Sequence, residues 1–401
     1  MERRSGFGIV VILLFTALCG QAQADDSIAI GALVSVTGRP AWVGVQTEAG
    51  LLDALQIANE EGGINGKKIN YVRQDAGETT DKAVTAFKNM MSTHHPLAVY
   101  SESEELTRTI GPDIKDRYKI LYSPASMSAE FADEGVNPYI FLAGPTDGDM
   151  LAILLKHIAR TTPSAKGAFL YSDSAFGKSP IPFARNMCRR LGLTLVGEET
   201  VAENTIDFVP QIKRLREKQP DYLIIHGFFL DSVKGIVGQC HVLGFKPAMI
   251  CTFSAGTRAL LRHMGKAAEG LRTISPYMCW WNDDVPMIKK IIAYNKKHYP
   301  YVEFRENSYM QGFMTGLIFV ECLRRADKAG QLNGEGLVQA LKSLKDFDTG
   351  GLSAPLTIRN NRFPVARIWQ TNVEKEIFEP VSGWIRVELY GALRDLDLPR
   401  Q

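Results

Sequence analysis

The 401-residue chain has no marked surplus of either charge, since 46 lysines and arginines stand against 44 aspartates and glutamates. A protein that binds nucleic acid usually presents a surplus of basic residues on one face, so this balance argues against a nucleic-acid partner. After residue 24 no apolar run approaches the roughly 20 residues that span a bilayer. The composition, 45% hydrophobic and 22% charged, is that of a soluble globular chain long enough for two domains.

Cysteine is scarce as well, and the six residues show no spacing typical of a metal site or a redox motif. Five of them follow residue 24, and an odd number cannot all pair. We therefore expect buried free thiols, and one disulfide bond among them stays open as the alternative. These five residues are Cys188, Cys240, Cys251, Cys279 and Cys322.

The sequence also lacks the common catalytic signatures. Around Ser254, Thr252 stands where the GxSxG elbow of a hydrolase needs its first glycine, and neither an HExxH segment nor a phosphate-binding P-loop occurs. The histidines show no metal-ligand spacing to one another. We therefore predict a protein that is not an enzyme and needs no metal or cofactor, with an exported hydrolase as the less favoured alternative.

The first 24 residues are typical of a cleavable signal peptide. Arg3 and Arg4 supply a positive start, residues 7–18 are apolar, and Ala22 and Ala24 form a small-x-small cleavage site. The apolar stretch is shorter than a membrane span. We expect the chain to be exported to the periplasm.

The stretch 28–76 predicts a strand, a helix and a second, parallel strand. Residues 28–36 are apolar enough for a strand buried on both faces, and residues 43–61 carry apolar side chains at steps of three and four. Gly62 and Gly63 end this helix, and residues 68–75 form the second strand. Such a βαβ unit is the building block of a doubly wound parallel sheet.

The same alternation continues and starts afresh at residue 166, which predicts an α/β fold with two sets of parallel strands. Residues 101–110 are expected to be a loop, and residues 270–281 interrupt the rhythm. The further expected strands are 97–100, 119–122, 138–143, 167–173, 193–201, 221–229, 248–252, 364–370 and 376–380. The further expected helices are 81–91, 112–117, 149–160, 183–191, 208–217, 231–243, 285–298, 306–329 and 334–343.

From residue 27 to about 384, the order of segments resembles the periplasmic ligand-binding proteins of the branched-chain amino acid transport type. The segments are VGVQTEAGLLDALQIANEEGGINGKKI, QDAGETTDKAV, ILYSPASMSAEF, IFLAGPTDGDM, LYSDSAFGKS, YLIIHGFF and IWQ. The resemblance implies a type I periplasmic binding fold, in which two doubly wound parallel-sheet lobes are joined by a three-segment hinge and close on a ligand.

The resemblance also implies where the chain crosses between the lobes. The crossings would fall near residues 144–147, 275–279 and 350–356. Lobe one would then comprise residues 25–145 and 276–350, and lobe two residues 146–275 and 351–390, followed by a tail at 391–401. Ligands of open parallel sheets lie beyond the carboxyl ends of the strands, where such lobes face each other.

Five strand-end loops would line the cleft between the lobes, and the family's ligand contacts are carried onto them. Trp42 matches an aromatic residue that packs on the ligand side chain. Ser103 and Glu104 fall where the family carries hydroxyl residues for the ligand carboxylate, although Glu102 and Glu104 add negative charge here. The predicted ligand-binding residues are Trp42, Ser103, Glu104, Ala125, Ser126, Met127, Phe176, Phe228 and Phe253.

Each of these residues has a purely structural alternative. Trp42 would cover the edge of a lobe, the acidic loop would be a solvated surface, and Ser126 would only cap the helix that follows it. Phe176 stands where the family has a tyrosine-like residue, and Phe228 and Phe229 stand where it has a tyrosine pair. A phenylalanine at a strand end is often part of the core.

Phe253 falls where amino-acid binders carry an acid for the α-ammonium group of the ligand. A buried ammonium group needs a carboxylate partner, which phenylalanine does not supply. We therefore expect an aromatic or branched carboxylic acid, or a neutral amide. Ammonium binding by Asp147 or Glu104 from the other side of the cleft stays open as the alternative.

Taken with the resemblance, these features predict the solute-binding subunit of an ABC importer. Its partners would be a small-molecule ligand and a permease in the inner membrane, and we expect a monomer. A sensor that presents its closed form to a receptor kinase is the alternative, because it would share the same fold and cleft.

Overall fold

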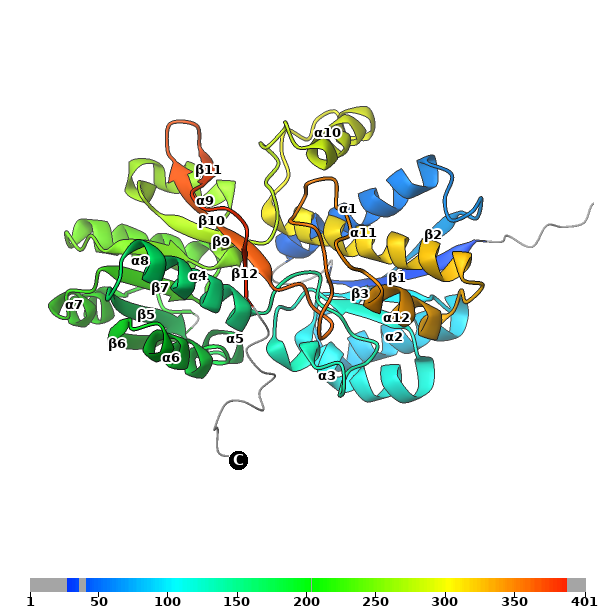
Figure 1. The fold of residues 1–401 in the computed structure, drawn as a ribbon, viewed down its shortest axis with the longest axis horizontal. Helices are drawn as coiled ribbons and strands as arrows, with labels where there is room; N and C mark the ends of the chain where they lie inside the picture. Colours follow the sequence, from blue (N-terminus) through cyan, green and yellow to red (C-terminus); the bar gives the residue numbers. More distant parts are fainter. Residues whose placement is uncertain (1–26, 36–40, 203, 388–401) are drawn as a thin grey trace, which may run out of the picture.

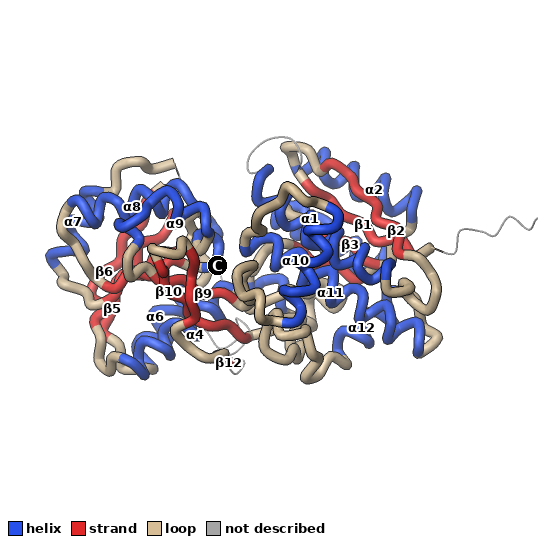
Figure 2. Tube along the Cα trace, turned by 90° about the horizontal axis from the view of Figure 1, so that it is seen from above, coloured by secondary structure: helices blue, strands red, loops and turns tan. Residues whose placement is uncertain are grey.

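The computed structural model describes residues 27–35, 41–202 and 204–387. These residues form two bodies side by side, each built around its own sheet (Figures 1 and 2). The first sheet has the strand order β2-β1-β3-β4 and is parallel throughout. Its strands are β1 (Ile28–Val34), β2 (Ile69–Asp75), β3 (Ala98–Ser101) and β4 (Leu121–Pro124).

The second sheet has the order β11-β10-β9-β8-β7-β5-β6, with β12 paired to β10. Strands β5 to β9 are parallel, whereas β10, β11 and β12 run antiparallel to their neighbours. The strands are β5 (Lys166–Ser172), β6 (Thr194–Val201), β7 (Tyr222–His226), β8 (Ala248–Cys251), β9 (Arg272–Ser275), β10 (Val365–Asn372), β11 (Ile377–Pro380) and β12 (Ile385–Arg386).

Helices cover both faces of each sheet. On the first sheet, Ile30 and Ala32 face one layer and Leu33 the other, as the alternation of a strand requires. The helices of this body, lobe one, are α1 (Ala41–Glu60), α2 (Thr80–His94), α3 (Glu104–Asp113), α10 (Pro286–His298), α11 (Asn307–Lys328) and α12 (Gly334–Lys342). Those of the second body, lobe two, are α4 (Asp147–Thr161), α5 (Ala175–Lys178), α6 (Ile181–Arg190), α7 (Val209–Glu217), α8 (Leu230–Val242) and α9 (Arg258–Met264).

Helices α1 and α11 pack directly against each other in lobe one (Figure 1). Two glycines make this close approach possible. A Cβ atom on Gly50 would lie 2.0 Å from the carbonyl oxygen of Tyr309, and one on Gly312 would lie 1.8 Å from that of Thr47. A larger residue at either position would therefore push the two helices apart.

The structure corrects four local expectations. Residues 101–110 are not a loop, because helix α3 begins at Glu104: the Ser103 hydroxyl accepts the Leu106 N–H at 3.1 Å, and Leu106 and Ile110 are buried one turn apart. Residues 138–143 form a single β-bridge, at Ile140, instead of a strand. Strand β9 and helix α9 occupy stretches for which no element was expected, since both are short.

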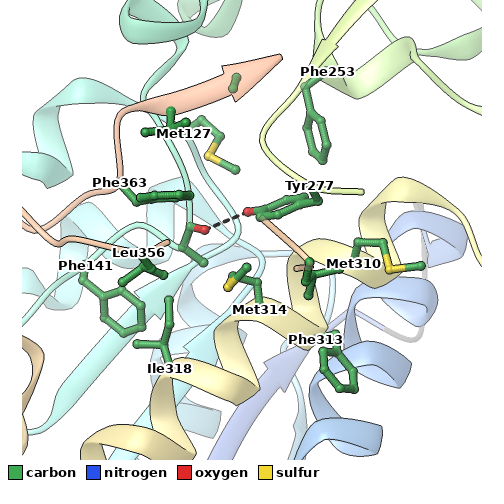
Figure 3. Packing of buried hydrophobic residues seen from close by; sticks show 14 of the residues in the cluster. Met127, Phe141, Phe253, Tyr277, Met310, Phe313, Met314, Ile318, Leu356 and Phe363 are labelled. Carbon is green, nitrogen blue, oxygen red and sulfur yellow. Dashed lines mark hydrogen bonds between the residues drawn. The ribbon is translucent and has the colours of Figure 1, made fainter. Parts of the chain in front are cut away.

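The chain passes between the lobes three times. The first two passages, at 143–147 and 275–279, are joined by the Tyr277 hydroxyl, which donates to the carbonyl oxygen of Ala143 at 2.9 Å (Figure 3). The third lies further along than 350–356, because the Leu356 N–H donates to Phe347 and the Ile358 N–H to Leu344, both in lobe one. We therefore place it at 359–364, before β10.

One hydrophobic cluster runs through both lobes and the passages between them, and Figure 3 shows part of it around Tyr277. The five cysteines after residue 24 are buried and free, as expected. Within the described ranges, no helix is long and apolar enough to cross a membrane. The predicted signal peptide and the tail at 391–401 lie outside the described residues.

Candidate ligand-binding cleft

A cavity of about 620 Å³ lies between the two lobes. Lobe one contributes the segments that follow the carboxyl ends of β1, β2, β3 and β4, and lobe two those that follow β5, β7 and β8. The carboxyl ends of parallel strands meet at one edge of a sheet, so both sheets direct these loops toward the same space. The start of α11 completes the lining.

Seven of the nine predicted residues line this cavity: Ser103, Glu104, Ala125, Ser126, Met127, Phe176 and Phe253. Phe228 does not, because it is only 3% exposed and packs edge-on against Phe208, with 6.2 Å between the ring centroids. Its neighbour Phe229 lines the cavity instead. The Trp42 side chain lies outside what the structure describes.

Ser126 and Glu104 are bonded to each other on the lobe-one side. The Ser126 hydroxyl donates to Glu104 Oε1 at 2.5 Å and accepts the backbone N–H of Ser128 at 2.9 Å. Arg108 donates to Glu104 Oε2 at 2.9 Å, so the Glu104 carboxylate already has a cationic partner. The Ser103 hydroxyl is committed to capping α3. Ser126 thus closes a turn with Ser128 while it faces the cavity, and it does not cap the 3₁₀-helix Ala129–Ala132, whose N-cap is Ser128.

Glu102 brings a second carboxylate into the cavity. Its Oε2 accepts the backbone N–H of Ser35 at 3.1 Å, whereas its Oε1 is buried with no hydrogen-bond partner among the described residues. Burial raises the pKa of Glu102, the Ser35 N–H opposes this shift and the nearby charge of Glu48 adds to it, and together these effects bring the pKa to about 7. Near neutral pH this carboxyl group is therefore partly protonated.

Asp147 is the first residue of α4 and lies on the first passage between the lobes. It is 6% exposed and lines the cavity. Burial raises the pKa of its carboxyl group well above the ordinary value, and the negative charges of Glu104 and Asp149 add to this shift. Asp149 itself is bound by Arg362, at 3.2 Å between Arg362 Nη2 and Asp149 Oδ1.

An aromatic wall faces these acids from lobe two. Phe176 and Phe229 lie with 6.1 Å between ring centroids. His226 supports Phe176 from behind: its Nε2 lies 3.1 Å from the Phe176 carbonyl oxygen, and its Nδ1 lies 3.0 Å from Thr252 Oγ1. Burial lowers the pKa of His226 to about 4, so at neutral pH the neutral ring donates to Phe176 and accepts from Thr252.

Phe253 extends this wall toward the hinge. Its ring packs edge-on against Tyr277, with 5.8 Å between the centroids, and it is 9% exposed (Figure 3). It begins a short turn of 3₁₀-helix at Phe253–Ala255, directly after strand β8. At this position the cleft therefore presents an apolar face and no acid.

The lobes also touch each other beside the cleft. The Glu306 carboxylate, at the start of α11, accepts the backbone N–H groups of Arg258 and Ala259 at 3.0 and 3.1 Å. The Asn307 amide donates to the Gly256 carbonyl oxygen at 2.6 Å. Glu306 thus occupies the N-terminus of α9, where the helix dipole favours an anion.

The protein-family model described as periplasmic binding protein matches residues 27–376. The chain belongs to this family. Among curated relatives, it is 24% identical to the Leu/Ile/Val-binding protein homolog 7 of Brucella melitensis biotype 1. That match covers 62% of this chain and 64% of the relative, so it spans less than two thirds of the relative's length.

Two solved structures show the same type I periplasmic binding protein fold. One is a branched-chain amino acid ABC transporter protein from Thermus thermophilus with bound valine, with a TM-score of 0.79 at 23% identity over 92% of this chain and 97% of that one. The other is a fatty acid ABC transporter substrate-binding protein from Thermomonospora curvata, with a TM-score of 0.76 at 20% identity over 94% and 95%. At these identities, the likeness concerns the fold alone.

The charged side chains that line the cleft of this periplasmic binding protein are all acidic among the described residues. Among the described residues that line it, none is a lysine, an arginine or a histidine, and four are acids. The sequence drew attention to the negative charge near residue 103 and to the pair Phe228 and Phe229, of which only Phe229 lines the cavity. The four acids are Glu78, Glu102, Glu104 and Asp147.

Proposed function

We propose that this periplasmic binding protein is the extracytoplasmic solute-binding subunit of an ABC importer. Its ligand would be a small, amino acid-like organic molecule held between the lobes. The observation that carries the proposal is the cavity of about 620 Å³, which is lined by strand-end loops of both lobes. A volume of this order suits a small metabolite.

The proposed mechanism is a shift between open and closed forms. A ligand that touches Met127 on one side and Phe176 on the other makes both contacts only when the lobes are together. It therefore binds the closed form better and raises its population by that difference in affinity. A permease in the inner membrane would then recognise the closed form, with no covalent chemistry by this chain. The signal peptide predicted over residues 1–24 would bring the chain to the periplasm.

The apolar part of the ligand would lie against the aromatic wall. Phe176, Phe229 and Phe253 offer flat faces, which favour an aromatic or branched group. The carboxylate expected from the sequence has less support, because the described lining holds four acids and no cationic side chain. A ligand carboxylate would depend on backbone N–H groups near Ser126, because the Ala125 N–H already donates to the Ser101 carbonyl oxygen at 2.7 Å.

A thermal-shift screen tests the proposal. The purified chain would be heated with amino acids, amines, aliphatic and aromatic carboxylates and small amides. A ligand at a hundred times its Kd should stabilise the folded form by about 2.7 kcal/mol. Small-angle scattering should then show a smaller radius of gyration with that ligand. If no compound stabilises the chain, or if the chain turns a compound over, the proposed function is wrong.

A further inference from the structure

We propose that Asp147 binds a positively charged nitrogen of the ligand, and that the ligand is a small organic cation, an amine on an apolar body. The proposal rests on the proposed function, since it names the ligand of that same cleft. The juxtaposition that carries it is one buried carboxylate with no partner, facing a cavity that has aromatic walls and no cationic side chain.

The Asp147 carboxylate has no hydrogen bond or ion pair with any residue that the structure describes. Its backbone is fixed, because the Asp147 N–H donates to the Met127 carbonyl oxygen at 2.8 Å. The residue is 94% buried, as its exposed fraction is 6%, and it lines the cavity. A buried carboxylate without a partner is costly, so a native protein retains one where a ligand completes it.

Two neighbouring acids, Glu104 and Asp149, are already satisfied. Glu102 accepts the Ser35 N–H and keeps only its Oε1 unpaired, which leaves Asp147 as the buried acid with no partner on either oxygen among the described residues. Glu104 is bound by Arg108 and by the Ser126 hydroxyl. Asp149 is bound by Arg362 and accepts the backbone N–H of Thr146 at 3.0 Å. Each of these carboxylates therefore has its counter-charge within the protein. The counter-charge of Asp147 has to come from the cavity.

The remaining walls fit an amine better than an acid. Met127 and Phe253 line the same cavity from opposite lobes, and an aromatic face attracts a nearby cation. A ligand carboxylate would meet Glu102, which enters from the segment after β3 and keeps one oxygen unpaired. An amine avoids that repulsion, whereas an amino acid or a simple acid does not.

The test compares matched ligands on the full exported chain by calorimetry at pH 7. One series is 2-phenylethylamine, phenylalanine and 3-phenylpropanoate, and the other is 3-methylbutylamine, leucine and 4-methylpentanoate. We expect an amine to bind most tightly and Asp147→Asn to weaken it by at least about tenfold. Asp173→Asn is the matched control, because Asp173 is exposed and lies outside the cavity lining.

A second readout needs no ligand. Asp147→Asn removes a buried carboxyl group whose raised pKa lowers the stability of the folded chain at pH 7, so it should raise the melting temperature of the unliganded protein, and Asp173→Asn should not. Equal binding of the amine by wild type and Asp147→Asn overturns the proposal, as does tighter binding of the amino acids or acids than of the amines. In those cases the proposed function stands, because a ligand has been found. The proposed function itself would fail if no compound of the wider thermal-shift screen stabilised the chain.

Discussion

Glu102→Gln should remove a pH-dependent loss of stability from the folded chain. The Glu102 side chain is held between the backbone N–H of Ser35 and Gly44, where a Cβ atom would lie 2.3 Å from its Oε1. Burial raises its pKa from 4.5 to about 7. The folded chain therefore binds this proton more strongly than the unfolded chain does. The favourable contribution of the protonated group is fully present below about pH 4.5 and is lost as the pH rises through about 7.

The size of the effect follows from the shift. A change from 4.5 to about 7 corresponds to about 3 kcal/mol between the protonated and ionised limits. The glutamine side chain of the variant cannot ionise, so the free energy of unfolding of Glu102→Gln should gain up to that amount over wild type between pH 4.5 and 8. For a chain of this size this is about 4 °C in Tm.

The assay is urea unfolding of both proteins at half-unit steps from pH 4.5 to 8. The quantity to follow is the difference in the free energy of unfolding between the two proteins, plotted against pH. A packing change that does not depend on pH shifts this difference by a constant and leaves its slope unchanged. Glu105→Gln serves as the control for the loss of one surface charge, since the Glu105 side chain is 63% exposed. A constant difference between wild type and Glu102→Gln across this range would refute the reasoning.

Three further predictions concern the walls of the cleft and the contacts between the lobes. Phe229→Ala should weaken ligand binding with little change in Tm, whereas Phe228→Ala should lower stability by about 3–5 kcal/mol because it opens a core cavity; calorimetry and urea unfolding separate the two. Arg362→Met leaves Asp149 as an unpaired buried carboxylate and should cost about 3–5 kcal/mol in urea unfolding. Glu306→Ala frees the N-terminus of α9 and should increase the radius of gyration of the unliganded chain in small-angle scattering, whereas alanine in place of the exposed Glu303 should not.

The long, strongly periodic elements could be predicted from the sequence, and the short ones could not. Helix α1 has a repeating apolar face and two glycines after it, so its limits were expected within about two residues. Helix α3 was missed because SESEELTRTI carries three acids and three hydroxyl residues before its last two positions, and only Leu106 and Ile110 are large apolar residues that face the core. Strand β9 has only four residues, and it is a strand because it pairs with β8 on one side and β10 on the other, which the local sequence does not reveal.

The candidate site was predictable as a set of loops and less so as a set of side chains. Strand ends fix which loops reach the cleft, which is why seven of the nine expected residues line it. Phe228 and Phe229 lie beyond the end of β7, after Gly227 with its positive φ, so the alternation of a strand does not assign their faces. The choice between them depends on Phe208, far away in sequence. Whether an acid is already neutralised also depends on distant partners, such as Arg362 for Asp149.

If Asp147 binds a cation as proposed, its position would link the charge of the ligand to closure of the lobes. Two residues further along α4, Asp149 is tied to Arg362 on the third passage, and Tyr277 on the second passage is tied to Ala143 on the first. The unpaired carboxylate therefore lies where all three passages are bound together. A cation that neutralises Asp147 there removes repulsion from Glu104, which belongs to lobe one, while α4 belongs to lobe two. The same contact would thus supply affinity and favour closure, since the repulsion that it removes acts between the lobes.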